Sequence, residues 1–308
     1  MAEGKGYGKC ILFNEHFVVY GIPSIVSAIG DSTVATIDTR ESGGIQLIDN
    51  RPATPGYKEE KLDHQKDSLN RILTAMKVDP DENIAITLAG NLYAASGVGA
   101  SAASCTAIAR ALNQFFDKGL NDDQINDVAY EGEKGYHGTP SGVDNAASTY
   151  GGLIWFVRGE TNTLEQISME EPVDIVMGNT GKVANTKAAV AGVRERKENH
   201  PQKYEALFSQ AHNLALAARK ALEAHDMQKV GELMNHNHEL LQAIEVSNAD
   251  LDKLVDTARS AGALGAKMTG GGLGGYMVAL TPGKKLQDTV ATAIEEKGFR
   301  VLKTRIGV

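Results

Sequence analysis

Small residues and glycines dominate the segment 91–103, NLYAASGVGASAA, which leads into an apolar stripe over 101–116 that predicts a helix. The first turn of a helix leaves backbone N–H groups unpaired and carries the positive end of the helix dipole. Gly97 and Gly99 would let this backbone approach a phosphate, and Ser101 could offer its hydroxyl to Mg²⁺. The segment is a candidate phosphate-binding loop, and a loop that only permits tight helix packing is the alternative.

The same segment contains Gly97-x-Gly99-x-x-Ala102, the spacing of a dinucleotide-binding fingerprint. Its context excludes that interpretation. Seven residues separate Gly97 from the predicted strand that ends near Ala89, and Asp117 lies at the end of a helix instead of a second strand. No glycine cluster has the G-x-x-x-x-G-K-[ST] pattern of a Walker A loop.

Two further segments carry charged residues that could perform chemistry. The segment 131–145, EGEKGYHGTPSGVDN, places Glu131 and Glu133 near a predicted helix end and Asp144 in a turn bounded by proline and glycine. A rigid turn can hold a catalytic carboxylate, although an ordinary acidic loop is the alternative. The segment 8–21, GKCILFNEHFVVYG, has Lys9 and the pair Glu15 and His16 on either side of an apolar strand.

A glycine-rich segment, KMTGGGLGG, occupies 267–275 and has five glycines in six positions. Because each glycine costs backbone entropy on folding, the close approach of a ligand or another loop is the natural compensation. His236 and His238 in NHNHE alternate, so they point to different sides of a helix, whereas metal-binding pairs on helices favour i, i+4. A solvated helix face is the prediction for both histidines.

Composition sets the broad class of this protein. The 308 residues are 42% hydrophobic and 23% charged, which indicates a folded protein of about two domains. The net charge of −8 argues against nucleic acid or an anionic membrane as a partner. Cys10 and Cys105 form no C-x-x-C pair and are expected to be small buried thiols. Neither a long apolar run nor an apolar N-terminal segment occurs in the sequence, so the expected location is the cytoplasm.

Hydrophobic periodicity predicts an α+β protein. A polar joint at 158–162 suggests a boundary near Ser168 and hence domains of 1–167 and 168–308. The first domain is expected to be mostly antiparallel, and Asn121 is the expected N-cap of its last helix. The expected strands are 9–14, 18–20, 24–29, 32–39, 45–48, 83–89, 153–157, 173–177, 276–280 and 300–304, and the expected helices are 62–76, 101–116, 122–132, 186–198, 203–224, 227–243, 251–261 and 286–297.

Taken in order, these segments resemble those of the GHMP small-molecule kinases and, among them, the mevalonate kinase family. E-H-x-V-V-x-G is matched by 15–21, the phosphate loop P-x-x-x-G-L-G-S-S-A-A from its third position on by 95–103, G-E-x-x-x-H-G-x-P-S-G-V-D-N by 132–145, and T-G-A-G-G-G-G by 269–275. The stretch 179–193 is similar to N-T-x-x-x-x-T-x-x-x-V-A-G-V. The sequence departs from the family pattern at Asn14, Tyr93, Ala100, Gly271 and Leu273.

The resemblance implies a two-domain GHMP kinase fold. The N-terminal domain, S5-like and β/α, would carry the phosphate loop and the catalytic aspartate. The C-terminal domain would be ferredoxin-like, with helices on an antiparallel sheet, and would carry the glycine-rich loop.

The resemblance also implies an activity: transfer of the γ-phosphate of ATP, with Mg²⁺, to the 5-hydroxyl of mevalonate in isoprenoid biosynthesis. Asp144 would accept the hydroxyl proton with Lys9 beside it, and Ser101 and Glu133 would hold Mg²⁺. Glu15, His16 and Thr186 would line the mevalonate pocket. The nucleotide-binding residues would be Ala95, Ser96, Gly97, Val98, Gly99, Ala100, Ser101, Ala102, Gly270, Gly271 and Gly272.

Three other functions stay open at this point. A GHMP kinase for another alcohol, such as phosphomevalonate, would need extra Arg or Lys, and the loops supply no obvious cluster. A nicotinamide-dependent oxidoreductase is disfavoured by the strand and loop context given above. A non-catalytic sensor on a kinase fold would have no reason to keep Lys9, Ser101, Glu133 and Asp144 together. The oligomeric state, a homodimer included, is not determined by the sequence.

Overall fold

The computed structural model describes residues 2–53, 55–94, 97–182, 184 and 186–308. It divides into two compact units: unit 1 is Met1–Lys9 with Ile29–Gly151, and unit 2 is Cys10–Ala28 with Gly152–Val308. Strands β1 (Ala2–Phe13) and β2 (Ser24–Thr39) contribute residues to both units. The sequence-based division at 167/168 stays a prediction.

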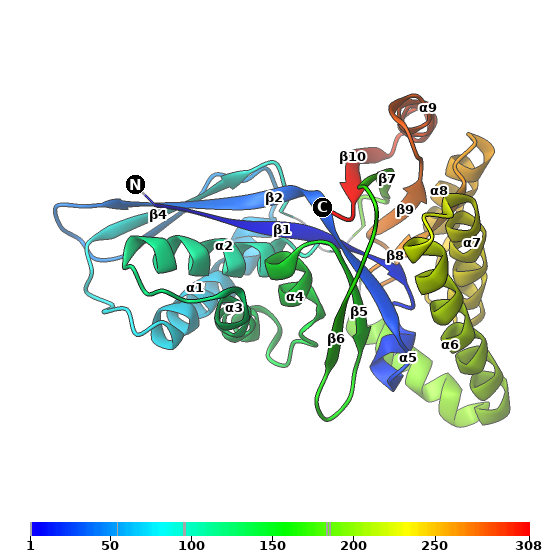
Figure 1. The fold of residues 1–308 in the computed structure, drawn as a ribbon, viewed down its shortest axis with the longest axis horizontal. Coiled ribbons are helices and arrows are strands. Elements are labelled where there is room, and N and C mark those ends of the chain that lie inside the picture. Colours follow the sequence, from blue (N-terminus) through cyan, green and yellow to red (C-terminus); the bar gives the residue numbers. More distant parts are fainter. Residues whose placement is uncertain (1, 54, 95–96, 183, 185) are drawn as a thin grey trace. The chain divides into compact units, whose positions relative to one another are not determined.

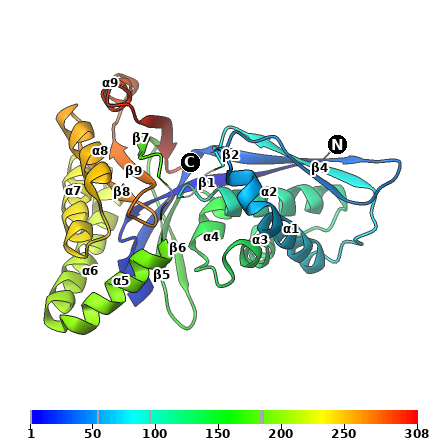
Figure 2. The same cartoon turned by 180° about the vertical axis from the view of Figure 1, so that it is seen from behind.

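Unit 1 is a small sheet covered by helices. The second half of β2 pairs antiparallel with β4 (Ile84–Gly90), in agreement with the mostly antiparallel arrangement expected, while β3 (Gln46–Asp49) pairs with β4 in parallel. Four helices lie on one face of this sheet (Figures 1 and 2). They are α1 (Tyr57–Ala75), α2 (Ala100–Phe115), α3 (Asp122–His137) and α4 (Val143–Tyr150).

The core of unit 1 lies between the sheet and these helices. Ile37 and Ile86 of the sheet are fully buried in one cluster with Ile72 of α1 and Leu112 of α2. The apolar stripe that predicted α2 faces this core, so α2 holds the candidate phosphate loop on a rigid element. Cys105 on the same helix is buried, as expected.

The start of α3 confirms the predicted cap. The Asn121 side chain accepts a hydrogen bond from the Gln124 N–H at 3.0 Å, and the Gln124 side chain accepts from the Asn121 N–H at 3.0 Å, which is a capping box. Helix α3 continues beyond the predicted end at 132 to His137. Asp144 is not in a turn as expected, because Gly142 (φ 88°) begins the short helix α4 and places Asp144 in its first turn.

Unit 2 contains an antiparallel sheet in the order β10-β7-β9-β8. The strands are β7 (Val173–Asn179), β8 (Gly265–Thr269), β9 (Tyr276–Leu280) and β10 (Arg300–Ile306). Helix α8 (Ala249–Ser260) contacts β8 and β9, and α9 (Lys284–Glu295) contacts β7 and β10, so helices pack on the sheet as expected.

Unit 2 also contains three helices and a hairpin that precede or follow strands of this sheet in the chain. Helices α5 (Thr186–Asn199), α6 (Pro201–Glu223) and α7 (Met227–Ala243) follow one another, and α6 lies beside α7 (Figures 1 and 2). Strands β5 (Leu153–Val157) and β6 (Thr163–Ile167) form an antiparallel hairpin, and β5 also pairs with the first residues of β2.

The structure differs from the predicted strands at four places. The expected strand 18–20 is a 3₁₀ helix, η1 (Phe17–Tyr20), that ends at Gly21 (φ 78°). The strands 24–29 and 32–39 are one continuous strand, β2. Strand β6 was not among the expected strands, because four of its five residues are exposed and it has no apolar pattern; the polar residues 158–162 connect it to β5. Strand β8, which lies directly before the glycine-rich loop, was also not among the expected strands.

No helix in the described part of the chain is long and apolar enough to span a membrane.

Candidate active site

Lys9 and Asp144 form an ion pair within unit 1. Lys9 Nζ lies 3.1 Å from Asp144 Oδ1, and the Lys9 side chain is 5% exposed while that of Asp144 is 32% exposed. Strand β1 supplies the lysine and the first turn of α4 supplies the aspartate. The pair therefore offers a carboxylate that a ligand can reach, with a buried ammonium against it.

The candidate phosphate loop packs directly on this lysine. The Lys9 N–H donates to the Val98 carbonyl at 2.9 Å. Gly99, the N-cap of α2, has φ 69°, and a Cβ at this position would lie 2.7 Å from Lys9 Cγ. Only glycine combines this left-handed backbone with so close an approach. The loop is consequently fixed beside Lys9 at its Val98–Gly99 end.

Three polar side chains gather near the first turn of α2. Glu133 on α3 is 1% exposed, and its Oε1 has no hydrogen-bond partner among the described atoms. Its other oxygen, Oε2, lies 3.8 Å from His137 Nε2, and Ser101 Oγ lies 3.4 Å from the same nitrogen. Burial raises the pKa of Glu133 to about 8, and the nearby Asp144 charge adds to this, while a hydrogen bond from Ser101 opposes it.

This donor set suits a magnesium ion. Mg²⁺ prefers oxygen ligands and usually takes one or two from the protein, with phosphate oxygens and waters completing its shell. The buried, unpartnered Glu133 Oε1 and the neighbouring Ser101 hydroxyl fit that requirement. No group of three or more His, Cys, Asp or Glu side chains forms a separate metal site in the described ranges.

His137 and Arg51 were missed by the sequence-based prediction. His137 follows Glu133 by four positions on α3, which places both on one helix face. Arg51 is 5% exposed, binds Asp49 through two bonds of 2.9 and 2.6 Å, and donates to the Ala100 carbonyl at 3.0 Å and to Ser104. Arg51 thereby fixes the helix turn that carries Ser101.

In unit 2, Glu15 and His16 are tied to the glycine-rich segment. Lys267 Nζ forms a fully buried ion pair with Glu15, and His16 Nε2 lies 3.1 Å from the Gly271 carbonyl. Burial lowers the pKa of His16 to about 4, so the neutral ring must donate its Nε2–H to this carbonyl. The role of Lys267 was not predicted, although a lysine inside the buried strand β8 is unusual.

The glycine-rich loop needs glycine at two of its predicted positions for clear physical reasons. Gly272 has φ 72°, and a Cβ at Gly271 would overlap Oγ1 of Thr186, so the two residues are in close contact, which the sequence did not predict. Leu273 also has positive φ, 56°, but its side chain is 38% exposed and its N–H donates to the Val246 carbonyl at 2.9 Å. The leucine is tolerated because it points to solvent.

We expect Leu273→Gly to change the KM for ATP more than kcat. Glycine removes a left-handed strain of about 1 kcal/mol but also frees the loop backbone. Steady-state kinetics with ATP varied, alongside thermal unfolding, measures both effects. Wild-type values of both kinetic parameters would show that this position does not influence nucleotide binding.

The two histidines of α7 differ in environment. His236 is exposed and pairs with Glu239 at 3.2 Å, as the solvated-face prediction requires. The prediction was wrong for His238, which is 2% exposed. Its Nε2 lies 3.1 Å from Asp252 Oδ1, and its Nδ1 accepts a hydrogen bond from the Met268 N–H at 3.3 Å.

His238 should make the enzyme less stable in acid. Burial lowers its pKa from 6.5 to about 4, so between these values the unfolded chain binds a proton that the folded chain excludes. The neutral His238 ring therefore contributes fully to the free energy of unfolding above pH 6.5. This contribution, at most about 3 kcal/mol, is lost as the pH falls toward 4. Denaturant unfolding at pH 7.5 and 4.5 should show a smaller pH effect in His238→Gln than in the control His236→Gln. Equal pH effects in the two variants would contradict the assignment.

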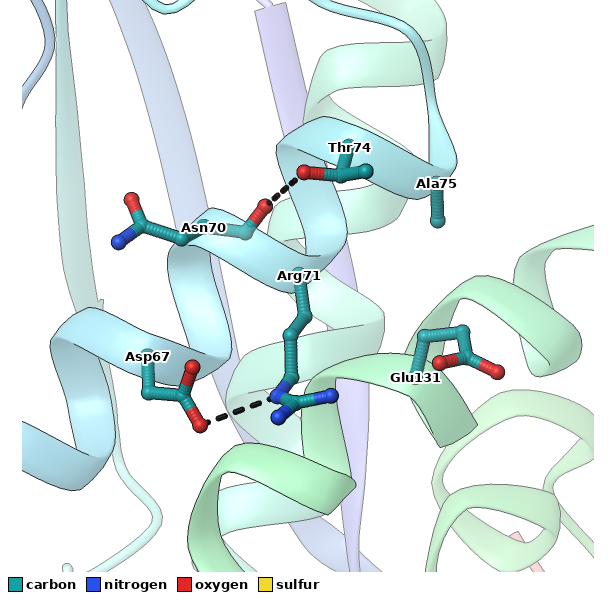
Figure 3. A pocket seen from close by; sticks show the side chains of 6 residues that line it. All are labelled: Asp67, Asn70, Arg71, Thr74, Ala75 and Glu131. Carbon is teal, nitrogen blue, oxygen red and sulfur yellow. Dashed lines mark hydrogen bonds and ion pairs between the residues drawn. The ribbon is translucent and has the colours of Figure 1, made fainter.

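Unit 1 also has a groove of about 450 Å³ between α1 and α3. Figure 3 shows that Ala75 and five polar residues of the two helices line it, with Arg71 hydrogen-bonded to Asp67 at 3.0 Å. Glu131 on the other wall pairs with Lys134 at 2.6 Å. Because its charges are already paired and exposed, the groove offers no reactive group.

The structure therefore brings together Lys9 with Asp144, Ser101 with Glu133, and His16 and Thr186 with Gly271. The predicted phosphate loop leads into the first turn of α2, as expected, and its described residues are Gly97, Val98, Gly99, Ala100, Ser101 and Ala102. Ala95 and Ser96 lie outside the described residues. The nucleotide and substrate roles of all these residues stay predictions.

Comparisons with known proteins give the same family. Residues 66–152 match the GHMP kinases N terminal domain, and residues 218–300 match the GHMP kinases C terminal family. A mevalonate kinase of Pyrococcus abyssi is 35% identical over 97% of this chain and 93% of its own length, and that of Aeropyrum pernix is 30% identical over 96% and 93%.

Solved structures agree in fold. The crystal structure of L. major mevalonate kinase in complex with R-mevalonate has a TM-score of 0.95 at 37% identity and covers 99% of this chain and 96% of that one. A structure of Streptococcus pneumoniae phosphomevalonate kinase in complex with phosphomevalonate and AMPPNP has a TM-score of 0.75 at 16% identity. It covers 99% of this chain and 100% of that one, and at this identity the likeness shows the fold alone. The expected two-domain GHMP kinase fold is confirmed, and the chain belongs to the GHMP kinases and, within them, to the mevalonate kinase family of phosphotransferases.

Proposed function

We propose that this enzyme transfers the γ-phosphate of ATP to the 5-hydroxyl of mevalonate, giving 5-phosphomevalonate and ADP. The observation that carries the proposal is the ion pair of 3.1 Å between buried Lys9 and accessible Asp144, in the same unit as the phosphate loop. A primary alcohol is a weak nucleophile, so an adjacent carboxylate that can take its proton is the group this reaction needs.

The reaction follows from these positions. The 5-oxygen of mevalonate forms a bond to the γ-phosphorus, the bond from that phosphorus to the ADP oxygen breaks, and the hydroxyl proton passes to Asp144. Lys9 stabilises the negative charge that develops around the transferred group. Most of the rate enhancement comes from such positioning and charge neutralisation.

We assign the phosphates of ATP to the turn from Gly97 to Ala102, with Gly270–Gly272 as a second nucleotide-binding segment. The helix α2 N–H groups and dipole favour an anion there. Ser101 and Glu133 would hold Mg²⁺, which neutralises phosphate charge when bound. Because the pKa of unliganded Glu133 is about 8, its carboxyl must lose a proton to serve as a ligand near neutral pH.

We assign Glu15, His16 and Thr186 to the mevalonate pocket. His16 donates Nε2–H to Gly271 and so presents Nδ1 as a hydrogen-bond acceptor for a hydroxyl. A cytoplasmic location and the absence of nucleic-acid or membrane partners stay predictions from the sequence.

An acceptor comparison tests this proposal. ADP release should be rapid with mevalonate and slow with phosphomevalonate, because a buried site for a small hydroxy acid cannot readily take a second dianion beside ATP. Homoserine and galactose complete the panel as acceptors of other GHMP kinases. A coupled ADP-release assay across these four alcohols measures kcat/KM for each. Comparable values for mevalonate and phosphomevalonate would favour the alternative, a phosphomevalonate kinase.

A further inference from the structure

Asn14 lies directly before Glu15 and His16, just after the end of strand β1. Its φ of 68° is left-handed, a conformation that glycine and asparagine reach at the lowest cost. The residue is fully buried, so its amide must find partners inside the protein.

Every polar atom of the Asn14 side chain has a partner in unit 2. Nδ2 donates to the Pro23 carbonyl at 2.8 Å and to the Ala211 carbonyl at 2.9 Å, and Oδ1 accepts from Asn237 Nδ2 at 3.0 Å. The Asn14 backbone N–H donates to Asn237 Oδ1 at 3.1 Å. Asn14 and Asn237 therefore hold each other at two points, across 223 positions of sequence.

Asn237 belongs to the NHNHE segment of α7, whose neighbours bind the strand before the glycine-rich loop. Asn235 Oδ1 accepts from the Ala266 N–H at 3.0 Å, and His238 Nδ1 accepts from the Met268 N–H at 3.3 Å. These N–H groups lie on the edge of β8 that does not pair with β9, so side chains of α7 supply hydrogen-bond acceptors to the unpaired edge of this buried strand.

Helix α7 thus positions both segments that form the acceptor pocket assigned above, the Glu15–His16 segment and the loop that carries Gly271. Asn237 fixes the residue before Glu15 and His16, and Asn235 with His238 fixes the strand that leads to Gly271. His16 and Gly271 then meet at 3.1 Å, and Glu15 meets Lys267.

We propose that Asn14 and Asn237 are positioning residues for the phosphoryl acceptor, acting through Glu15 and His16. This inference rests on the proposed function, because it assigns the acceptor to the Glu15–His16 pocket. Small displacements of positioning groups can cost about 100-fold in rate. The two asparagines bind no substrate themselves, so their loss should change acceptor use without changing ATP binding.

The test compares Asn237→Ala, Asn14→Gly and the double variant with wild type and with His236→Ala, an exposed control on the same helix. We expect each asparagine variant to lower kcat/KM for mevalonate by about 10- to 100-fold while the dissociation constant for ATP stays within about twofold. The double variant should lose about as much as the worse single variant, because the two residues act as one unit. Asn14→Gly keeps a residue that suits φ 68°, so it tests the proposal even if Asn237→Ala does not fold.

A lowered melting temperature with wild-type kcat/KM would show a merely structural role and overturn the inference. The inference would also fail if the losses of kcat/KM in the two single variants added up in the double variant, or if ATP affinity fell as much as kcat/KM for mevalonate. Wild-type enzyme that does not phosphorylate mevalonate would refute the proposed function and this inference with it. Active wild type with unaffected variants would refute the positioning role alone.

Discussion

Replacing Asp144 by asparagine should lower kcat for mevalonate by about 10²–10⁴-fold while ATP still binds. Asparagine keeps the size of the side chain and removes only the charge and the ability to take a proton. Asp144 is held in the first turn of α4 with Lys9 Nζ 3.1 Å away, so the substitution leaves the lysine without its partner but moves no backbone. The loss should therefore appear in the chemical step.

Steady-state kinetics with a parallel ATP-binding titration separates the two effects. Asp127→Asn, an exposed aspartate of the same unit, is the matched control and should retain wild-type kcat. If Asp144→Asn keeps more than about a tenth of wild-type kcat, below the usual size of a general-base effect, then Asp144 is not the base.

The second large effect is expected at the proposed magnesium ligands. Glu133→Gln and Ser101→Ala should each lower kcat strongly and raise the Mg²⁺ concentration needed for half-maximal rate. Glutamine preserves the shape of Glu133 but supplies no negative charge to the ion. The double variant should lose little more than the worse single variant, since residues that act through one ion form a unit.

Mg²⁺ titrations of the rate for the four enzymes provide the measurement. Glu131→Gln is the control, because Glu131 lies two positions away on the same helix and pairs with Lys134 instead. Losses that add fully, together with an unchanged Mg²⁺ requirement, would rule out a shared ion.

Elements with a strong local pattern were predictable. Helix α7 has the predicted bounds, and α3 begins after the predicted Asn121 cap. Both were predictable because helix periodicity and capping depend on residues that are close in the sequence. Strand β6, exposed over most of its length, has no such pattern, and its pairing with β5 decides its structure. The segment 18–20 forms η1 although its residues favour strands, since tertiary context overrides propensity.

The site was predictable where a family pattern covered it. Lys9 and Asp144 were placed together only through the resemblance, because 135 positions separate them and no local rule pairs residues at that distance. Lys267 and Asn237 were missed for the same reason, because their partners lie far away in the sequence. Lys267 and Glu15, for example, are 252 positions apart. Buried polar contacts of this kind become visible only in the folded chain. His137 is four positions after Glu133 on α3 and lies within the matched family pattern, but no role was assigned to it.

The most direct measurement for the central claim is ³¹P NMR of the products formed from ATP and mevalonate by wild-type enzyme. The account predicts ADP and a single new phosphomonoester whose phosphorus couples to the two protons on carbon 5 of mevalonate, and neither product with Asp144→Asn over the same time. ADP with inorganic phosphate alone, or a phosphate on another oxygen of mevalonate, would contradict it.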